Sequence, residues 1–251
     1  MGFVKSPFIA DANVKLVLAD NRIPSDMEEN LRKRNIEIIK TPKCSDVYPA
    51  ISGHPDISAF NCGYGDIIVC PNLYEEYKSR FNIYNINIIK GETVISMQYP
   101  EDIAYNVCIV GKYAIHNFKY TDKKVKEYID LKGFEKIDIK QGYSKCSVCV
   151  VDENSIITSD KGIHREVLKY GIDSLLIEQG HIDLFEMNHG FIGGCSGIID
   201  DDKIAFTGNI KEHPDFERIE EFLNKKNKEI ISLGNERLID LGSIIPIEVY
   251  D

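Results

Sequence analysis

A short pattern recurs five times along this chain and constrains its fold more than any other feature of the sequence. Each time, an apolar run typical of a β-strand ends in an Asn or Asp that begins a polar, helix-like segment. The five residues lie between 43 and 51 positions apart and are Asn21, Asn72, Asn117, Asp160 and Asn209. Asn and Asp are preferred helix N-caps, because their side-chain oxygen accepts a hydrogen bond from an unpaired backbone N–H. A repeat of this length predicts a fold built from similar units.

Each expected cap is followed by a predicted helix. The five helices are expected over Ser25–Lys33, Leu73–Arg80, Thr121–Lys132, Lys161–Tyr170 and Pro214–Lys226. The last is the clearest, because Ile219, Phe222 and Leu223 share one face at helical spacing. A short β-branched run follows each helix, and two strand-like stretches joined by a turn precede most of the caps. The repeating unit is therefore predicted to be β-β-α-β.

The two ends of the chain supply the remaining unit between them. Only one clear strand, Val14–Asp20, precedes the first helix, and one strand-like run, LGSIIPIEV, is left over at the C-terminus. Pairing of these two runs would close a ring of five units and leave no exposed sheet edge. We therefore expect an α/β fold, a pseudo-fivefold propeller of five β-β-α-β units in a single domain spanning residues 1–251. The alternative is one open, doubly wound sheet of βα units.

Four stretches of sequence carry a resemblance to a known superfamily. They are HPDISAFNCGYGDIIV, YPEDIAYNVCIVGKYAIHNFKYTD, QGYSKCSVCVVDENSIIT and LIDLGSIIPI. Together with the five units, they resemble the pentein fold of the guanidine-modifying enzymes, which include deiminases, dimethylarginine dimethylaminohydrolases and amidinotransferases. The resemblance places Asp56 where the family has a carboxylate that grips the guanidinium, and Asp102 where it has an aspartate near the substrate. It covers nearly the whole chain in organisation but only short pieces of sequence.

Two residues depart from the pattern of that superfamily. Tyr143 stands where the family has its general acid/base histidine, and Ser243 stands about where the nucleophilic cysteine is expected. The family chemistry uses a thiolate that attacks the guanidinium carbon and a histidine that moves protons. The resemblance therefore implies either a hydrolase or transferase acting on the C–N bonds of a guanidino compound, or a non-catalytic pentein that binds a small ligand or a protein. An open α/β sheet with an unrelated activity is a third alternative.

The candidate site follows from the expected ring, in which the starts of the first strands converge on the axis. The catalytic candidates are Cys146, His54 and Cys195, and the substrate-binding candidates are Asp56, Asp102, Lys145 and Ser243. Cys146 is the preferred nucleophile, because the ammonium of the adjacent Lys145 can lower the pKa of a thiol. Structural roles remain the alternatives: His54 and Asp56 can form a turn, and Cys146 and Cys195 can be small buried apolar residues.

The sequence predicts no metal site and no cofactor. Cys146 and Cys149 form a C-x-x-C pair, but their odd offset within one expected strand puts the side chains on opposite faces. No cluster has the spacing of zinc or calcium ligands, and neither a P-loop nor a dinucleotide-binding motif occurs. His181-Ile182-Asp183 matches a His-x-Asp tripeptide of agmatine deiminases, but it comes one unit too late, so we interpret it as a chance match.

Charge narrows the choice of partners. The chain has 30 Lys and Arg against 40 Asp and Glu, a net charge of -10, which disfavours nucleic acid and anionic membranes and favours a small cationic ligand. The sequence contains neither a long apolar run nor a signal peptide, so we expect a cytoplasmic protein. Its seven cysteines are an odd number in mostly apolar runs and are expected to be reduced thiols. The oligomeric state is left open.

Overall fold

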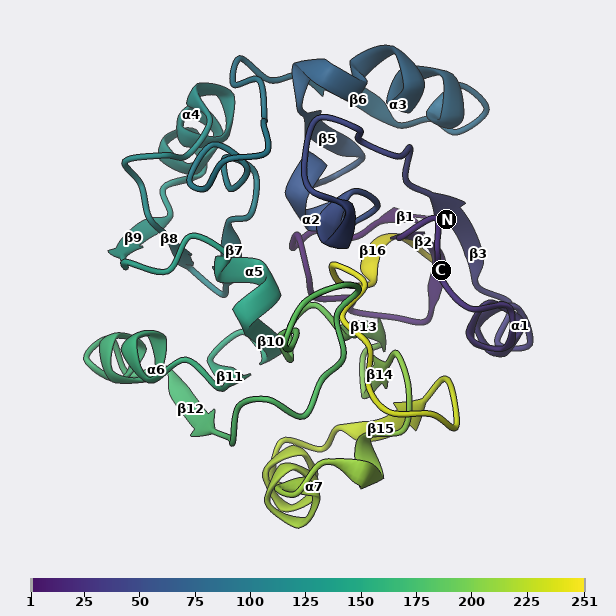
Figure 1. Ribbon diagram of the computed structural model, residues 1–251, viewed down its shortest axis with the longest axis vertical. Helices are drawn as coiled ribbons and strands as arrows, with labels where there is room; N and C mark the ends of the chain where they lie inside the picture. Colours follow the sequence, from purple (N-terminus) through teal and green to yellow (C-terminus); the bar gives the residue numbers. More distant parts are fainter. Residues whose placement is uncertain (1, 251) are drawn as a thin grey trace.

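The computed structural model describes residues 2–250, and the strands within this range form five small sheets. Figure 1 shows the sheets arranged around a common centre, with the longer helices on the outside. Four sheets have three strands each: β4 (Ala59–Gly63), β5 (Asp66–Val69) and β6 (Asn87–Lys90); β7 (Cys108–Val110), β8 (Tyr113–His116) and β9 (Glu135–Asp138); β10 (Val148–Asp152), β11 (Ser155–Thr158) and β12 (Asp173–Leu176); β13 (Ser196–Asp200), β14 (Lys203–Phe206) and β15 (Glu229–Ser232).

The predicted β-β-α-β unit is present in each of these sheets. The first two strands pair antiparallel and the third pairs parallel with the second, as in β10, β11 and β12. The connection to the third strand carries a helix, since a parallel pair needs a crossover. The five expected helices lie within two residues of their predicted ends: α1 (Ser25–Arg32), α3 (Tyr74–Phe81), α4 (Lys123–Lys132), α6 (Lys161–Leu168) and α7 (Phe216–Lys225).

The fifth sheet contains both ends of the described chain. Its order is β1–β16–β2–β3, formed by Gly2–Phe3, Ile245–Val249, Val14–Ala19 and Glu37–Lys40. β16 pairs antiparallel with β2, so the C-terminal strand completes the unit that the N-terminal strand begins. The predicted pairing of the N- and C-terminal strands is therefore present, while the five sheets stay separate and the strands of residues 2–250 form no single closed sheet.

The first strands of neighbouring units contact one another without sharing a backbone ladder. β7 contacts β10, β10 contacts β13, β13 contacts β16, and β16 contacts β4. Figure 1 shows the labelled strands β7, β10, β13 and β16 near the centre, with the longer helices at the periphery. Residues immediately before these strands are therefore brought towards one another, as the sequence predicts.

Three of the five predicted caps are wrong, because a turn or a short 3₁₀ segment comes before the helix. Asp160 does cap α6, accepting hydrogen bonds from two backbone N–H groups, and Asn209 caps the 3₁₀ helix Ile210–Glu212. The residues expected as caps that do not cap a helix are Asn21, Asn72 and Asn117. For α4, the side chain of Asp122 takes this role, because a turn separates Asn117 from the first helical residue.

The segments before two of the first strands are also helical and not extended. The strand expected from Cys146 starts at Val148, and the preceding residues form a short helix, α5 (Ser144–Ser147). A matching short helix, α2 (Pro55–Ser58), precedes β4. The premise that Cys146 and Cys149 share one strand is therefore wrong. In both units the helical turn positions the residues that enter the centre.

The core is made of two apolar clusters. One includes Phe60 and Tyr105 and involves mainly the sheets of β4 and β7, while the other includes Phe206 and Leu223 and involves mainly the sheets of β13 and β2. Burial of this much apolar surface is the main stabilising contribution to such a fold. No helix within residues 2–250 is both long enough and apolar enough to span a bilayer.

Candidate functional site

Side chains from four of the five units meet at the centre of the molecule. They are Asp56 on α2, Asn106 just before β7, Lys145 and Cys146 on α5, and Ser243 just before β16. We call these five residues the central cluster, and they are between 0% and 3% exposed. Gly193, just before β13, adds a backbone carbonyl from the remaining unit. The structure thus brings together four of the predicted site residues, Asp56, Lys145, Cys146 and Ser243.

Hydrogen bonds join the side chains of the central cluster. Cys146 Sγ lies 3.2 Å from both carboxylate oxygens of Asp56, to which the thiol donates. Asn106 Nδ2 donates to Cys146 Sγ at 3.1 Å, and its Oδ1 accepts from the backbone N–H groups of Lys145 and Cys146. Ser243 Oγ donates to Asp56 Oδ2 at 2.8 Å and accepts from Lys145 Nζ at 2.9 Å. The thiol and the carboxylate are therefore held against each other from several sides.

Lys145 provides the cationic group of the central cluster. Besides Ser243, its Nζ contacts the carbonyl oxygens of Gly193 and Val148 at 3.3 and 3.4 Å, and it lies 5.1 Å from the centre of the Phe8 ring. Burial raises the pKa of Asp56 to about 6, although the Lys145 ammonium acts in the opposite direction. An unpaired buried carboxylate is costly, so Lys145 partly compensates for the charge of Asp56.

Cys146 is not activated in this arrangement. Burial and the adjacent Asp56 raise the pKa of its thiol well above the ordinary value. The Lys145 ammonium bonds to Ser243 and not to the thiol. The expectation that Lys145 lowers the pKa of Cys146 is therefore wrong: burial and the carboxylates of Asp56 and Asp240 raise it.

His54 lies beside the central cluster as the residue preceding α2. It is 1% exposed, and neither ring nitrogen has a hydrogen-bond partner among the described residues. Nδ1 lies 3.9 Å from Asp240 Oδ1, and Nε2 lies 4.0 Å from Asp20 Oδ2. Burial lowers the pKa of this imidazole. His54, Asp56 and Cys146 each offer one potential ligand atom, and these atoms lie within 4.8 Å of one another. The sequence analysis expected these three residues at one site but predicted no metal there.

Two further carboxylates surround His54. Asp240 is 1% exposed and accepts hydrogen bonds from the backbone N–H groups of Phe191 and Gly242. Asp20 is fully buried and pairs with Arg22 at 2.6 Å. Together with Asp56, three buried carboxylates therefore lie near His54. Only two cationic side chains, Lys145 and Arg22, lie near enough to offset their negative charge. The interior on this side favours an additional cation.

Asp102 belongs to a separate hydrogen-bonded group. Tyr143 Oη donates to Asp102 Oδ2 at 2.6 Å and lies 2.7 Å from Tyr48 Oη. Burial and the Asp102 carboxylate raise the pKa of Tyr143 far above its ordinary value, so Tyr143 does not act as a base in place of the family histidine. Asp102 is buried and its Oδ1 has no hydrogen-bond partner among residues 2–250.

Cys195 and His181 also lie outside the central cluster. Cys195 is fully buried in the second apolar cluster, where its thiol donates to the carbonyl oxygen of Ile192 at 3.3 Å. His181 is partly exposed and bonds to Glu178 at 3.1 Å. Of the candidates, the structure therefore brings together His54, Asp56, Lys145, Cys146 and Ser243, and places Asp102 and Cys195 elsewhere.

The sequence analysis missed Asn106, Asp240 and Asp20. Asn106 stands two residues before β7, as Cys146 and Ser243 stand two residues before β10 and β16, so its position in the repeat was an available signal. Asp240 lies inside the C-terminal stretch LIDLGSIIPI, which already resembled a family motif. Asp20 ends the first apolar run and carries no local signal for a site.

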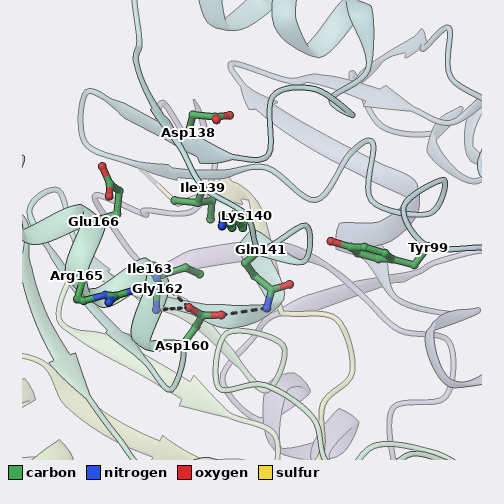
Figure 2. A pocket seen from close by; sticks show the side chains of 10 residues that line it. All are labelled: Tyr99, Asp138, Ile139, Lys140, Gln141, Asp160, Gly162, Ile163, Arg165 and Glu166. Carbon is green, nitrogen blue, oxygen red and sulfur yellow. Dashed lines mark hydrogen bonds between the residues drawn. The ribbon is translucent and has the colours of Figure 1, made fainter.

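An open pocket of about 610 Å³ lies apart from the central cluster, beside α6 (Figure 2). Among the residues that line it are Asp138, Lys140, Gln141, Asp160 and Arg165. Its polar groups are partly used within the chain, since Asp160 caps α6 and accepts a hydrogen bond from Gln141. None of the candidate residues lines this pocket, so it gives no access to the thiol.

Comparison with known proteins identifies the family and the fold. A family model described as "Family of unknown function (DUF6873)" matches residues 18–245. No curated protein matches the sequence.

Solved structures resemble the whole chain at low sequence identity. An amidinotransferase of the saxitoxin pathway from Microseira wollei has a TM-score of 0.58 and 12% identity, covering 92% of this chain and 91% of its own. An inosamine-phosphate amidinotransferase from Streptomyces griseus has a TM-score of 0.59 and 8% identity, covering 100% and 98%. A DDAH from Pseudomonas aeruginosa, a Cys-to-Ser variant complexed with citrulline, has a TM-score of 0.56 and 10% identity, covering 88% and 92%. All are pentein superfamily members, which confirms the predicted resemblance in fold.

Proposed function

Because the chain belongs to DUF6873, a family of unknown function, and has the pentein fold, we propose that its central cluster binds a small guanidinium or amidine compound and modifies it through Cys146. One observation carries this proposal. Cys146 Sγ lies 3.2 Å from both oxygens of the buried Asp56 carboxylate. A candidate nucleophile and a carboxylate suited to binding the cation are thus adjacent at the centre of this chain. Its fold is shared with amidinotransferases and with a DDAH complexed with citrulline.

The geometry of the carboxylate suits a planar cation. A guanidinium donates two parallel hydrogen bonds to one carboxylate, and its carbon then lies roughly 4 Å from the carboxylate carbon. The thiol of Cys146 already contacts both oxygens, so a cation bound to Asp56 replaces the thiol as the hydrogen-bond donor. Positive charge beside a thiol favours the thiolate. In this proposal the ligand itself activates Cys146, which explains how a thiol with a raised pKa can serve as a nucleophile.

The neighbouring residues have distinct roles in the proposed reaction. The Cys146 thiolate attacks the guanidinium carbon and forms a C–S bond, and a C–N bond then breaks. His54 takes the thiol proton and returns it to the departing amine, so that charge and protons balance. Asn106 donates to the sulfur, while Lys145 and Ser243 position Asp56. Water or an acceptor amine then displaces the amidino group from sulfur, giving hydrolysis or transfer.

We also propose that residues 1–251 form a single domain, because all five units contribute to the same centre. We further propose that the five sheets form a pseudo-fivefold propeller around that centre, with the contacts between first strands in place of a continuous ladder.

A second function is favoured by the burial of the central cluster. Its side chains are at most 3% exposed, and the thiol and carboxylate already satisfy each other. A chain that lacks the usual Cys–His pair and keeps its centre closed is suited to a non-catalytic role, in which a pentein binds a small ligand or a protein. A ligand that raises the melting temperature and is recovered unchanged would favour this alternative.

The test is to trap the covalent intermediate. The protein is mixed with agmatine, arginine and other guanidino compounds, quenched in acid, and digested for peptide mass spectrometry. We expect an amidino adduct on the Cys146 peptide that is absent from Cys146→Ala and retained in Cys149→Ala, a matched variant of a buried cysteine in the other apolar cluster. Turnover that persists in Cys146→Ala, or an adduct on a different cysteine, would overturn the proposal.

A further inference from the structure

The grouping of His54, Asp56 and Cys146 carries a second inference, which goes beyond the proposed function and does not depend on it. Each residue offers one potential ligand atom, and the three atoms lie within 4.8 Å of one another in a fully buried setting. We propose that these three side chains form a binding site for a thiophilic divalent cation, with Zn²⁺ the best match. No sequence motif indicates this site, because α2 and the residue before it supply two of the ligands and α5 supplies the third.

The distances are close to those of a metal site. Ligand atoms on one tetrahedral zinc lie roughly 3.3 to 3.7 Å apart, because the metal–ligand bonds are about 2.0 to 2.3 Å long. Cys146 Sγ and the Asp56 oxygens are already 3.2 Å apart. The histidine nitrogen lies within 4.8 Å of these atoms and is the one that has to move closer on binding.

His54 provides an observation independent of the distances. A buried imidazole without hydrogen bonds is costly, so a ring with both nitrogens unpartnered needs an explanation. Neither Nδ1 nor Nε2 has a partner among residues 2–250. Coordination of one nitrogen leaves the other facing a carboxylate, Asp240 or Asp20, at 3.9 or 4.0 Å. A carboxylate behind a metal-bound histidine is the usual second partner of such a ligand.

Charge and donor type define the ion. The Cys146 thiolate and the Asp56 carboxylate together neutralise a divalent cation, and Asn106 and Ser243 already contact these two ligands. A set of sulfur, imidazole nitrogen and carboxylate oxygen favours Zn²⁺ or Co²⁺ over Mg²⁺ and Ca²⁺, which prefer oxygen ligands. Three protein ligands leave a fourth position for a water or another small ligand. Binding releases the thiol proton, and a coordinated Cys146 is then not free to act as a nucleophile.

The test measures the metal directly. Tag-free protein in reduced form is titrated with Co²⁺ while thiolate-to-cobalt absorption in the near ultraviolet is followed, and Zn²⁺ is then added to displace it. We expect one equivalent of Co²⁺ with a charge-transfer band, complete displacement by Zn²⁺, and release of about one proton per metal ion. The variants Cys146→Ala and His54→Gln should bind at least 10-fold more weakly, and the Cys146→Ala band should be absent.

Matched variants separate this site from adventitious binding. Cys149→Ala and His213→Gln remove a buried cysteine and a buried histidine outside the group, and both should bind like the unmodified protein. Circular dichroism confirms that each variant is folded before titration. If Cys146→Ala is unfolded, the proposal is judged by the Co²⁺ affinity of Asp56→Asn and by the thiolate-to-cobalt band of the unmodified protein. Binding without a thiolate band, or binding unchanged in His54→Gln, would overturn the proposal. Neither result bears on trapping of a guanidino adduct, which tests the proposed function alone.

Discussion

Replacing Lys145 by Met tests how the central cluster is held together. Met keeps an unbranched side chain of similar length but removes the ammonium. The change deletes the 2.9 Å hydrogen bond to Ser243 and leaves the carbonyl oxygens of Gly193 and Val148 without that donor. It also removes the charge that lowers the pKa of the buried Asp56. The side chain is only 3% exposed, so water does not replace these interactions.

The size of the effect follows from these contacts and depends on pH. Loss of a charged hydrogen bond and of the neighbouring cation together should reduce the free energy of unfolding by about 3 kcal/mol at pH 8. Burial raises the pKa of Asp56 from 3.8 to about 6, so the stability linked to this group is fully present below 3.8 and is lost as the pH rises through about 6. Lys145→Met raises this pKa further. The difference between variant and unmodified protein should therefore be smaller at pH 5, where only the hydrogen bonds of Lys145 are lost, and largest at pH 8.

The assay is urea denaturation followed by circular dichroism at pH 5 and pH 8. Lys136→Met is the control, because Lys136 is 38% exposed and its ion pair with Asp130 is on the surface, where such pairs contribute little. A loss below about 1 kcal/mol at pH 8, or a loss equal at both pH values, would refute the role given to Lys145. The same denaturation curves show whether the variant is folded at all.

Three further predictions use the same structure. Burial lowers the pKa of His116 from 6.5 to about 4, so the stability linked to this histidine is present above pH 6.5 and is lost as the pH falls towards 4. Urea denaturation should show that the free energy of unfolding of the unmodified protein falls by roughly 3 kcal/mol over this range, and by less in His116→Gln. Ser243→Ala removes the hydroxyl shared by Lys145 and Asp56 and should lower the free energy of unfolding by about 2 kcal/mol, against little change for the exposed Ser79→Ala. All seven cysteines are buried, so iodoacetamide should label the ligand-free native protein at least about 100-fold more slowly than the protein in urea; rapid labelling at pH 7 would contradict the closed centre.

Much of the fold was predictable because its signals are local. The apolar face of α7 and the β-branched runs after each helix depend only on residues close in sequence, so helix ends were predicted to within two residues. The caps at Asn21 and Asn117 were wrong because the turn before each helix depends on how the chain leaves the sheet. The pairing of the N- and C-terminal strands was predictable because each chain end left an incomplete unit, whereas the contacts between first strands of separate sheets carry no local signal.

The candidate site was predictable in position but not in chemistry. The repeat indicated where side chains enter the centre, which led to Asp56, Cys146 and Ser243. The same rule applied to every unit would have included Asn106. The state of the thiol was not predictable, because the adjacent Lys145 suggests activation while the outcome depends on burial and on a carboxylate 90 positions away in sequence. The sequence analysis missed Asp20 and Asp240 for the same reason, because only the folded chain brings them close to His54.

The proposed role of Asp56 and Cys146 can be tested without knowing the natural ligand. The rate of alkylation of Cys146 is measured by peptide mass spectrometry with two reagents of similar shape, a cationic haloacetamidine and the neutral haloacetamide, in the unmodified protein and in Asp56→Asn.

We expect the cationic reagent to label Cys146 at least about 10-fold faster than the neutral one. The other six cysteines should show no such preference, and Asp56→Asn should abolish it at Cys146. Equal rates with the two reagents at Cys146, or a preference that survives in Asp56→Asn, would contradict a cation site at the centre of this fold.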